Sequence, residues 1–233
     1  MEAEAVWQHR GFFSRLQHGR PWITLKLATS LDGKVALGSG ESKWITGKKA
    51  RDAGHMLRAE SDAILSTSRS VANDNARLTC RTPGLEHRSP VRVVIDRNLR
   101  LEQNCSLFAD DTSPVWLMSY KDDVGELELP SHVKLCTLES SANWLADLFD
   151  YLGERGMNHV LVEVGGTFAS ALLGAGLVDE LYWFRAPMII GDEGISAVKN
   201  LNADSLDGLR HWQLRETKRF GDDQLDVLVK VRE

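Results

Sequence analysis

Hydrophobic residues alternate with polar ones, or form short uninterrupted runs, at intervals along the chain, and both patterns predict strands. Residues 23–28 (ITLKLA) alternate, which is the period of a half-buried strand. Continuous apolar runs, typical of strands buried on both faces, lie at 62–65, 91–96, 114–119, 132–138 and 159–164. Three further strands are predicted at 180–191, 210–220 and 223–232.

Helical patterns separate several of these strands. Helices are predicted at 47–60, 141–156 and 165–180, and Thr46 is the predicted N-cap of the first. Residues 66–84 are polar, rich in turn formers and long for a connection. Such a segment is either a plain link or, more typically, a binding loop.

The order of these elements predicts an α/β fold with a mostly parallel, mixed sheet. The last two strands are joined by a tight turn at 221–223 without a helix, so we expect an antiparallel hairpin at the C-terminal end. Residues 1–20, with amphipathic fragments around Phe12 and Leu16, are interpreted as a linker or lead-in helix that packs on the body of the protein. Residues 21–233 are interpreted as one domain.

Charge and composition narrow the classes of function. The 28 Lys and Arg against 33 Asp and Glu give a net charge of -5, so the chain has no overall positive field to attract nucleic acid. No apolar run approaches the roughly 20 residues that cross a bilayer. Three dispersed cysteines and scattered histidines predict a reducing cytoplasm and no bound metal.

Two short stretches stand out as candidates for chemistry. Lys26 interrupts the first strand, either as a solvated lysine on an edge strand or as a functional group on a rigid support. Residues 160–173 (VLVEVGGTFASALL) place Gly165 and Gly166 between a strand and a helix, where backbone N–H groups can bind a phosphate. The alternative is a tight turn with Gly165 at positive φ.

Charged residues at strand ends and in loops form a second set of candidates. Arg58 and Arg81 can fork a phosphate, or they are ordinary surface arginines. Arg97 follows a strand at its carboxyl end, where a cation suits the 2′-phosphate of NADP and a solvated loop is the alternative. The carboxylates of Asp32, Asp74 and Glu163 can orient a sugar hydroxyl, accept a proton or cap a turn.

Several of these motifs, in the same order, resemble the reductase domain of the bacterial riboflavin biosynthesis protein RibD. The resemblance covers nearly the whole chain from about residue 11 and rests on the stretches GFFSRLQHGRPWITLKLATSLDGKVALGSGESKWIT, LRAESDAIL, NDNARLTCR and VEVGGTFASALLGAGLVDELYWFRAPMIIG. It implies a three-layer, dihydrofolate-reductase-like fold. It also implies an NADPH-dependent oxidoreductase that converts the ribosyl group of 5-amino-6-(5-phosphoribosylamino)uracil to ribityl.

The resemblance further implies a set of site residues. The catalytic group is Lys26, Asp74 and Glu163. The phosphorylated ribosylaminopyrimidine is bound by Ser42, Arg58, Leu78 and Arg81. NADPH is bound by Thr46, Ser70, Thr79, Asp96, Arg97, Gly165, Gly166 and Thr167. Members of the family commonly form homodimers.

Departures from the family pattern leave alternatives open. Ala76 and Cys80 stand where the family usually has proline and valine, and Val164 stands where it commonly has glycine or alanine. These changes favour, as the alternative, a reductase of the same fold acting on another pterin or pyrimidine. A binding protein without turnover is a further hypothesis. The zinc ligands of the deaminase often fused to this family are missing, so the chain is either a stand-alone reductase or part of a bifunctional protein.

Overall fold

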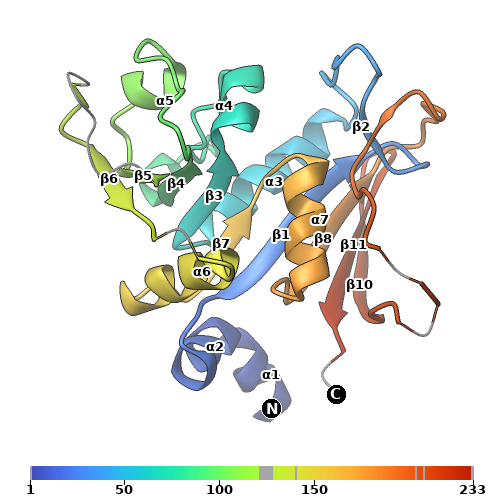
Figure 1. Ribbon diagram of the computed structural model, residues 1–233. Coiled ribbons are helices and arrows are strands. Elements are labelled where there is room, and N and C mark those ends of the chain that lie inside the picture. The colour runs from blue at the N-terminus through green and yellow to red at the C-terminus, as the bar shows by residue number, and fades with distance from the viewer. Residues whose placement is uncertain (1, 121–127, 140, 203, 207, 232–233) are drawn as a thin grey trace. The chain divides into compact units, whose positions relative to one another are not determined.

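The computed structural model describes residues 2–120, 128–139, 141–202, 204–206 and 208–231. The chain forms two compact units (Figure 1). Unit 1 comprises Met1–Trp22 and His55–Val162, and unit 2 comprises Ile23–Gly54 and Glu163–Glu233. Within the described residues, no helix is both long enough and apolar enough to cross a membrane.

Unit 1 contains five parallel strands in the order β7-β3-β4-β5-β6. The strands are β3 (Ala63–Thr67), β4 (Val91–Ile95), β5 (Val115–Ser119), β6 (Val133–Thr137) and β7 (His159–Val162). The helices are α1 (Glu2–Gln8), α2 (Arg10–His18), α4 (Ser68–Asp74), the 3-10 helix η1 (Glu86–Arg88), α5 (Ser106–Ala109) and α6 (Trp144–Glu154). All five apolar runs form strands as predicted, and four of these strands are mostly buried. The prediction of burial is wrong for β6, which lies at the edge of the described sheet with Lys134 and Thr137 exposed.

The polar segment 66–84 is not a continuous loop, which corrects the prediction. It begins with α4, whose N-cap Thr67 accepts a hydrogen bond from the Ser70 N–H at 3.3 Å. Val71 from α4 and Leu78 from the following stretch are buried in the core of unit 1 with Ile64 and other strand residues. A helix can form in this polar sequence because two apolar side chains pack on the sheet.

Helix α2 turns a different face inward from the one that its apolar residues predict. Phe12 and Leu16 are exposed, whereas Gly11 and Ser14 are buried. A Cβ at Gly11 would lie 2.6 Å from the carbonyl oxygen of Asn158, so the helix backbone approaches this neighbour closely. The small residues therefore face inward because the backbones are too close for Phe12.

A buried arginine holds together one end of unit 1. Arg92 on β4 is fully buried, and its guanidinium donates to the carbonyl oxygens of Leu107 (3.2 Å), Asp110 (2.6 Å) and Ser113. The carboxylate of Asp110 lies 3.8 Å from the same guanidinium. Burial lowers the pKa of Arg92, and the charge of Asp110 opposes that shift. The arginine thus satisfies backbone acceptors of two buried residues, Leu107 and Ser113, and of half-buried Asp110.

Unit 2 contains a mixed set of strands in the order β10-β11-β8-β1 and a separate pair, β2 with β9. The strands are β1 (Trp22–Thr29, in this unit from Ile23), β2 (Lys34–Ala36), β8 (Glu180–Arg185), β9 (Ile195–Ser196), β10 (Trp212–Phe220) and β11 (Asp223–Lys230). The helices are α7 (Gly166–Ala175) and the first part of α3 (Lys48–Ala59). Strand β1 is parallel to β8, whereas β11 is antiparallel to both β8 and β10.

The predicted C-terminal hairpin is confirmed. Strands β10 and β11 pair up to Phe220 and Asp223, which leaves a two-residue turn with Gly221 at φ 71°. The strand predicted at 180–191 is shorter than expected and ends at Arg185. Pro187 lacks the N–H that a longer ladder requires. A mostly parallel α/β sheet with antiparallel C-terminal strands agrees with the predicted fold class.

Candidate active site

Lys26 is half-buried on β1 and faces a carboxylate. Its side chain is 21% exposed, and Nζ lies 3.9 Å from Oε2 of Glu163, itself 18% exposed. The ring centroid of Phe184 is 5.9 Å from the same Nζ. The neighbours Leu25 and Leu27 are buried, as the alternation requires. The interpretation of Lys26 as a solvated lysine does not fit this environment.

The diglycine connection starts α7 without a capping side chain. Gly165 is the N-cap with φ −74° and ψ 163°, so the alternative of a tight turn with Gly165 at positive φ is wrong. Because the N-cap is a glycine, it has no side chain to accept from the first turn of the helix. The N–H groups of Phe168 and Ala169 both donate to the Gly165 carbonyl oxygen at 3.1 Å. A Cβ at Gly166 would lie 2.3 Å from the Ser196 carbonyl oxygen, so Gly166 is required for close packing.

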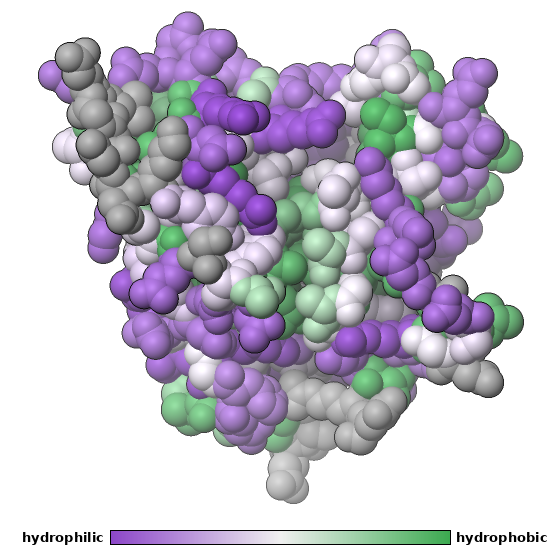
Figure 2. Space-filling view, viewed as in Figure 1, coloured by the Kyte–Doolittle hydropathy of each residue, from purple (hydrophilic) through white to green (hydrophobic). Residues whose placement is uncertain are grey.

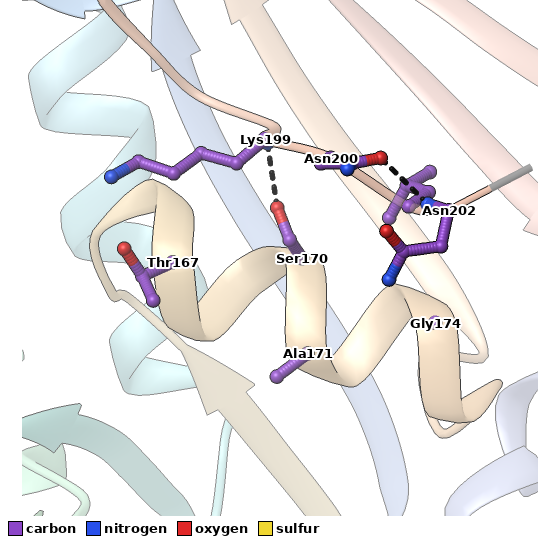
Figure 3. Close-up of a pocket in the computed structure, with 8 residues that line it drawn as sticks. Thr167, Ser170, Ala171, Gly174, Lys199, Asn200 and Asn202 are labelled. Carbon is purple, nitrogen blue, oxygen red and sulfur yellow. Dashed lines mark hydrogen bonds between the residues drawn. The ribbon is translucent and has the colours of Figure 1, made fainter.

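A pocket of about 360 Å³ lies between one face of α7 and the segment 199–202 (Figure 3). Ser170 fixes the segment, because its hydroxyl donates to the Gly166 carbonyl oxygen and accepts from the Lys199 N–H, both at 2.7 Å. The Lys199 side chain extends along α7 towards Thr167 (Figure 3). Figure 2 shows pale and hydrophobic residues over α7 beside hydrophilic ones.

The loop that carries Ser42 and Thr46 is attached to the C-terminal hairpin. The N–H of Gly47 donates to Oδ2 of Asp223 at 2.6 Å, and Asp223 is buried at the start of β11. Helix α3 begins at Lys48, so Thr46 is not its adjacent cap as predicted. The Thr46 side chain is buried instead, while Ser42 is half-buried.

We expect Asp223→Ala to weaken binding at this loop more than it lowers kcat. The substitution leaves the Gly47 N–H without its acceptor and frees residues 42–47 from β11. The expected result is a rise in KM of about 3- to 10-fold both for the pyrimidine that Ser42 is predicted to bind and for the NADPH that Thr46 is predicted to bind. Asp223→Asn retains an acceptor oxygen and is the matched control. Equal steady-state constants for the alanine variant and the wild type would contradict the role given to this hydrogen bond.

Unit 1 carries the arginines that were predicted to bind phosphate. Arg58, near the end of α3, donates from Nη1 to the Thr79 carbonyl oxygen at 2.9 Å. Arg81 is exposed, and its backbone N–H and its Nε each lie 3.3 Å from a ring nitrogen of His55. A neutral imidazole accepts at one nitrogen only, so one of these two hydrogen bonds forms at a time. Both guanidiniums are oriented by nearby groups of their own unit.

Other predicted residues of unit 1 lie at turns and helix ends. Asp74 is the exposed last residue of α4, and Ser70 lies in its first turn. Leu78 has φ 60°, and its side chain is in the hydrophobic core, so only its backbone is left to contact a ligand. Thr79 is buried, and its carbonyl oxygen accepts from Arg58.

The end of β4 gives different environments to Asp96 and Arg97, which were both predicted to bind NADPH. Asp96 is buried, and its Oδ2 accepts from the N–H groups of Arg100 (2.7 Å) and Leu101 (2.8 Å). Arg97 is exposed, and its guanidinium carbon lies 3.9 Å from the ring centroid of Trp144. Asp96 therefore shapes the turn, whereas Arg97 presents a charge.

Asp32, a third candidate carboxylate, has a structural role in unit 2. Its Oδ1 accepts from the Ser30 hydroxyl at 2.6 Å, and its Oδ2 accepts from the Gly191 N–H at 2.8 Å. The Ser30 hydroxyl, followed by the Gly191 N–H, lowers the pKa of Asp32 to about 2. This carboxylate joins the β1–β2 turn to the segment after β8.

The structure shows contacts between some of the predicted site residues within each unit. Lys26 meets Glu163 in unit 2, next to Gly165, and Arg58 meets Thr79 in unit 1. Sequence reasoning missed Asp223, His55 and Trp144, which contact residues that it did select. Each of them contacts a residue that is distant in sequence. The local sequence could therefore indicate these three residues only by their type, which is acidic or aromatic. Among the described residues, no group of three His, Cys, Asp or Glu side chains is placed to hold a metal.

Comparison with known proteins identifies relatives over nearly the whole chain. RibD of Haemophilus influenzae is 37% identical over 95% of this chain and 61% of its own length. RibD of Escherichia coli is 34% identical over 96% of this chain and 64% of its own. The chain thus spans less than two thirds of these relatives.

Solved structures agree with the sequence comparison. RibD of Acinetobacter baumannii is similar with a TM-score of 0.85 and 28% identity, over 98% of this chain and 63% of that one. A Thermotoga maritima protein described as a diaminohydroxyphosphoribosylaminopyrimidine deaminase/5-amino-6-(5-phosphoribosylamino)uracil reductase has a TM-score of 0.84 and 26% identity, over 99% and 62%. The riboflavin biosynthesis reductase Rib7 of Saccharomyces cerevisiae, at 19% identity and a TM-score of 0.69 over 98% and 100%, shows the fold alone. The predicted dihydrofolate-reductase-like fold class is confirmed. The family model described as the RibD C-terminal domain matches residues 21–225, and this chain belongs to that family.

Proposed function

We propose that this chain is an NADPH-dependent reductase that converts the ribosyl group of 5-amino-6-(5-phosphoribosylamino)uracil to ribityl. The observation that carries the proposal is the half-buried pair of Lys26 and Glu163 directly before the uncapped start of α7. An ammonium and a carboxylate on rigid elements, beside backbone N–H groups suited to a phosphate, are what a sugar-reducing enzyme with a dinucleotide cofactor requires. Membership of the RibD C-terminal domain family supports the same activity.

The proposed chemistry is the reduction of an opened ribosylamine. The ring oxygen leaves C1′ as a hydroxyl and a C1′=N imine forms; hydride then adds to C1′, and a proton goes to the nitrogen. The reduced nicotinamide supplies the hydride when it is bound. Lys26 hydrogen-bonds to the ribose oxygens and stabilises the charge that develops there, because its ammonium is held on β1 with little exposure to water. Glu163 orients Lys26 and accepts hydrogen bonds from the sugar hydroxyls.

The substrate phosphate is proposed to bind to residues of unit 1. We propose that Arg58 and Arg81 bind it through their guanidiniums, with the Leu78 backbone as a further contact; Ser42, in unit 2, is proposed as a substrate-binding residue in its own right. Arg58 is already oriented by the Thr79 carbonyl oxygen, and a guanidinium that is held in place loses less conformational entropy on binding a phosphate. Asp74 is proposed to hold the sugar.

The residues present fit a nicotinamide dinucleotide. The N-cap of α7 is a glycine without a side chain, so a diphosphate can approach the helix start closely near Gly165, Gly166 and Thr167. Arg97 supplies a cation for a 2′-phosphate, while Thr46, Ser70, Thr79 and Asp96 are proposed to line or shape the cofactor site. We further propose NADPH as the cofactor, the cytoplasm as the location, a homodimer as the assembly and residues 1–20 as a lead-in to a reductase domain at 21–233.

A reductase assay tests the proposal. Purified chain is mixed with the phosphoribosylamino pyrimidine and either NADPH or NADH, and oxidation of the nicotinamide is followed at its absorbance band. We expect turnover with NADPH, and a rise in KM for the pyrimidine of about 10- to 100-fold in Arg58→Ala and in Arg81→Ala, because each removes a charge-assisted contact to the phosphate. Exposed Arg88, on η1, provides the matched control Arg88→Ala.

The altered segment after α4 favours one alternative, a reductase of the same fold with another pterin or pyrimidine substrate. Cys80 is buried there, where its thiol lies 3.3 Å from the His55 carbonyl oxygen beside Arg81. In the proposed function Arg58 and Arg81 bind the substrate phosphate, whereas a substrate without a phosphate would not need them. If the dephosphorylated pyrimidine is reduced as well as the phosphorylated one, and the arginine variants leave both KM values unchanged, the alternative is correct.

A further inference from the structure

Arg97, at the carboxyl end of β4, lies over one aromatic ring and near a second. Its guanidinium carbon lies 3.9 Å from the ring centroid of Trp144, the first residue of α6, and 5.3 Å from that of Tyr120, just after β5. The two rings are themselves in edge contact, with centroids 6.4 Å apart and planes at 79°. The guanidinium of Arg97 thus contacts two residues from segments that are distant from it in sequence.

The backbone reinforces this arrangement. The Arg97 carbonyl oxygen accepts from the Ser119 hydroxyl at 3.3 Å and from the Tyr120 N–H at 3.4 Å. These contacts tie the turn after β4 to the end of β5, the strand beside it. The position of Arg97 is therefore fixed at both its main chain and its side chain.

Stacking fixes the plane of a guanidinium without consuming its N–H donors. A carboxylate partner would occupy those donors, whereas an aromatic face binds the cation through its quadrupole and leaves the edge for a planar, bidentate acceptor. Arg97 remains exposed despite its ring contacts. Burial raises the pKa of Tyr120, and the nearby charge of Arg97 opposes that shift, which is consistent with a cation held close to the phenol.

The carboxylate of Asp96 is turned away from the position where it would repel a 2′-phosphate. A carboxylate at the end of a strand commonly binds the ribose 2′-hydroxyl and repels a 2′-phosphate. The Asp96 side chain is buried, and its Oδ2 is already bonded to the N–H groups of Arg100 and Leu101. The charge presented at this turn is the positive one of Arg97.

We propose that Trp144 and Tyr120 are positioning residues that hold Arg97 for the 2′-phosphate of an adenine dinucleotide and so set the preference for NADPH over NADH. This inference rests on the proposed function, since it concerns the cofactor of that reaction. Arg97 contacts the ligand, while the two rings act through Arg97 alone. Removal of either ring should therefore affect discrimination between the cofactors and leave affinity for NADH unchanged.

The test uses calorimetric binding of 2′,5′-ADP and 5′-AMP, two probes that differ by the 2′-phosphate and require no turnover. We expect the wild type to bind 2′,5′-ADP at least about 10-fold more tightly than 5′-AMP, and Arg97→Gln to remove that difference. Trp144→Ala should reduce it about 3- to 10-fold, and Trp144→Phe should restore most of it, because a phenyl ring still stacks. The ratio of kcat/KM for NADPH and NADH should change in parallel.

Arg155 supplies the matched control, because its guanidinium carbon lies 3.2 Å from the ring centroid of Tyr151 at the other end of α6. Arg155→Ala removes an equivalent cation–π pair and should leave the 2′,5′-ADP preference unchanged. The proposal is overturned if the wild type shows no such preference, or if Trp144→Ala leaves the preference unaltered. Absence of pyrimidine reduction would refute the proposed reaction instead, since the binding measurement stands apart from it.

Discussion

Replacing Lys26 with methionine is expected to lower kcat for reduction of the phosphoribosylamino pyrimidine at least about 100-fold. Methionine fills a similar volume on β1 and removes only the ammonium. In the proposed reaction, the half-buried Nζ, 3.9 Å from Glu163, stabilises charge on the ribose oxygens while C1′ is reduced. Preorganised charges of this kind contribute more in a site with little water than on an open surface.

The Lys26→Met substitution should slow the chemical step and leave the affinity for the cofactor unchanged. Steady-state kinetics with saturating pyrimidine and NADPH measure kcat, and calorimetry measures NADPH affinity separately. Lys48→Met is the matched control, because Lys48 also lies in unit 2, but its side chain is 80% exposed and pairs with Asp52 on the same helix. Turnover by Lys26→Met within a few-fold of the wild type would remove Lys26 from the catalytic group.

The second large effect concerns stability. Arg92→Met is expected to lower the free energy of unfolding by about 3 to 5 kcal/mol, since it breaks a buried charge network by removing one partner. The carbonyl oxygens of Leu107, Asp110 and Ser113 would lose their donor, and Leu107 and Ser113 are buried residues. The Asp110 carboxylate would also lose its nearby cation.

Urea unfolding followed by tryptophan fluorescence measures this change. Arg88→Met, at an exposed position of the same unit, should change the free energy of unfolding by less than about 0.5 kcal/mol. Arg92→Lys keeps a charge but loses the forked donor geometry, so we expect an intermediate loss. An Arg92→Met protein as stable as the wild type would show that the carbonyl oxygens find other donors.

The local pattern of the chain predicted most strands and the type of sheet. Alternation over residues 23–28 and short apolar runs elsewhere correspond to β1, β3, β4, β5, β6 and β7, because strand geometry repeats every two residues and inner strands need apolar side chains on both faces. The edge position of β6, where Lys134 and Thr137 are exposed, was not predicted. The two-residue turn between β10 and β11 followed from a glycine in a tight connection. These features depend on neighbours in sequence.

Other elements required a tertiary neighbour. Helix α4 forms within a polar segment because Val71 and Leu78 have a sheet to pack on. Helix α2 turns Gly11 inward because its backbone meets Asn158, so its apolar residues were misleading. In both cases the local sequence had a different preference, and packing decided the outcome.

The same distinction between local sequence and tertiary contacts applies to the candidate site. The sequence by itself determined that a lysine interrupts a strand, that two glycines precede a helix and that an arginine follows β4, and the resemblance to a family gave these residues roles. Only the tertiary structure decided that Lys26 faces Glu163, that Asp223 holds the Gly47 N–H and that Trp144 stacks on Arg97. Periodicity and turn chemistry act over a few residues, whereas each of these contacts joins segments far apart in the chain, and their distance and burial exist only after the chain has folded.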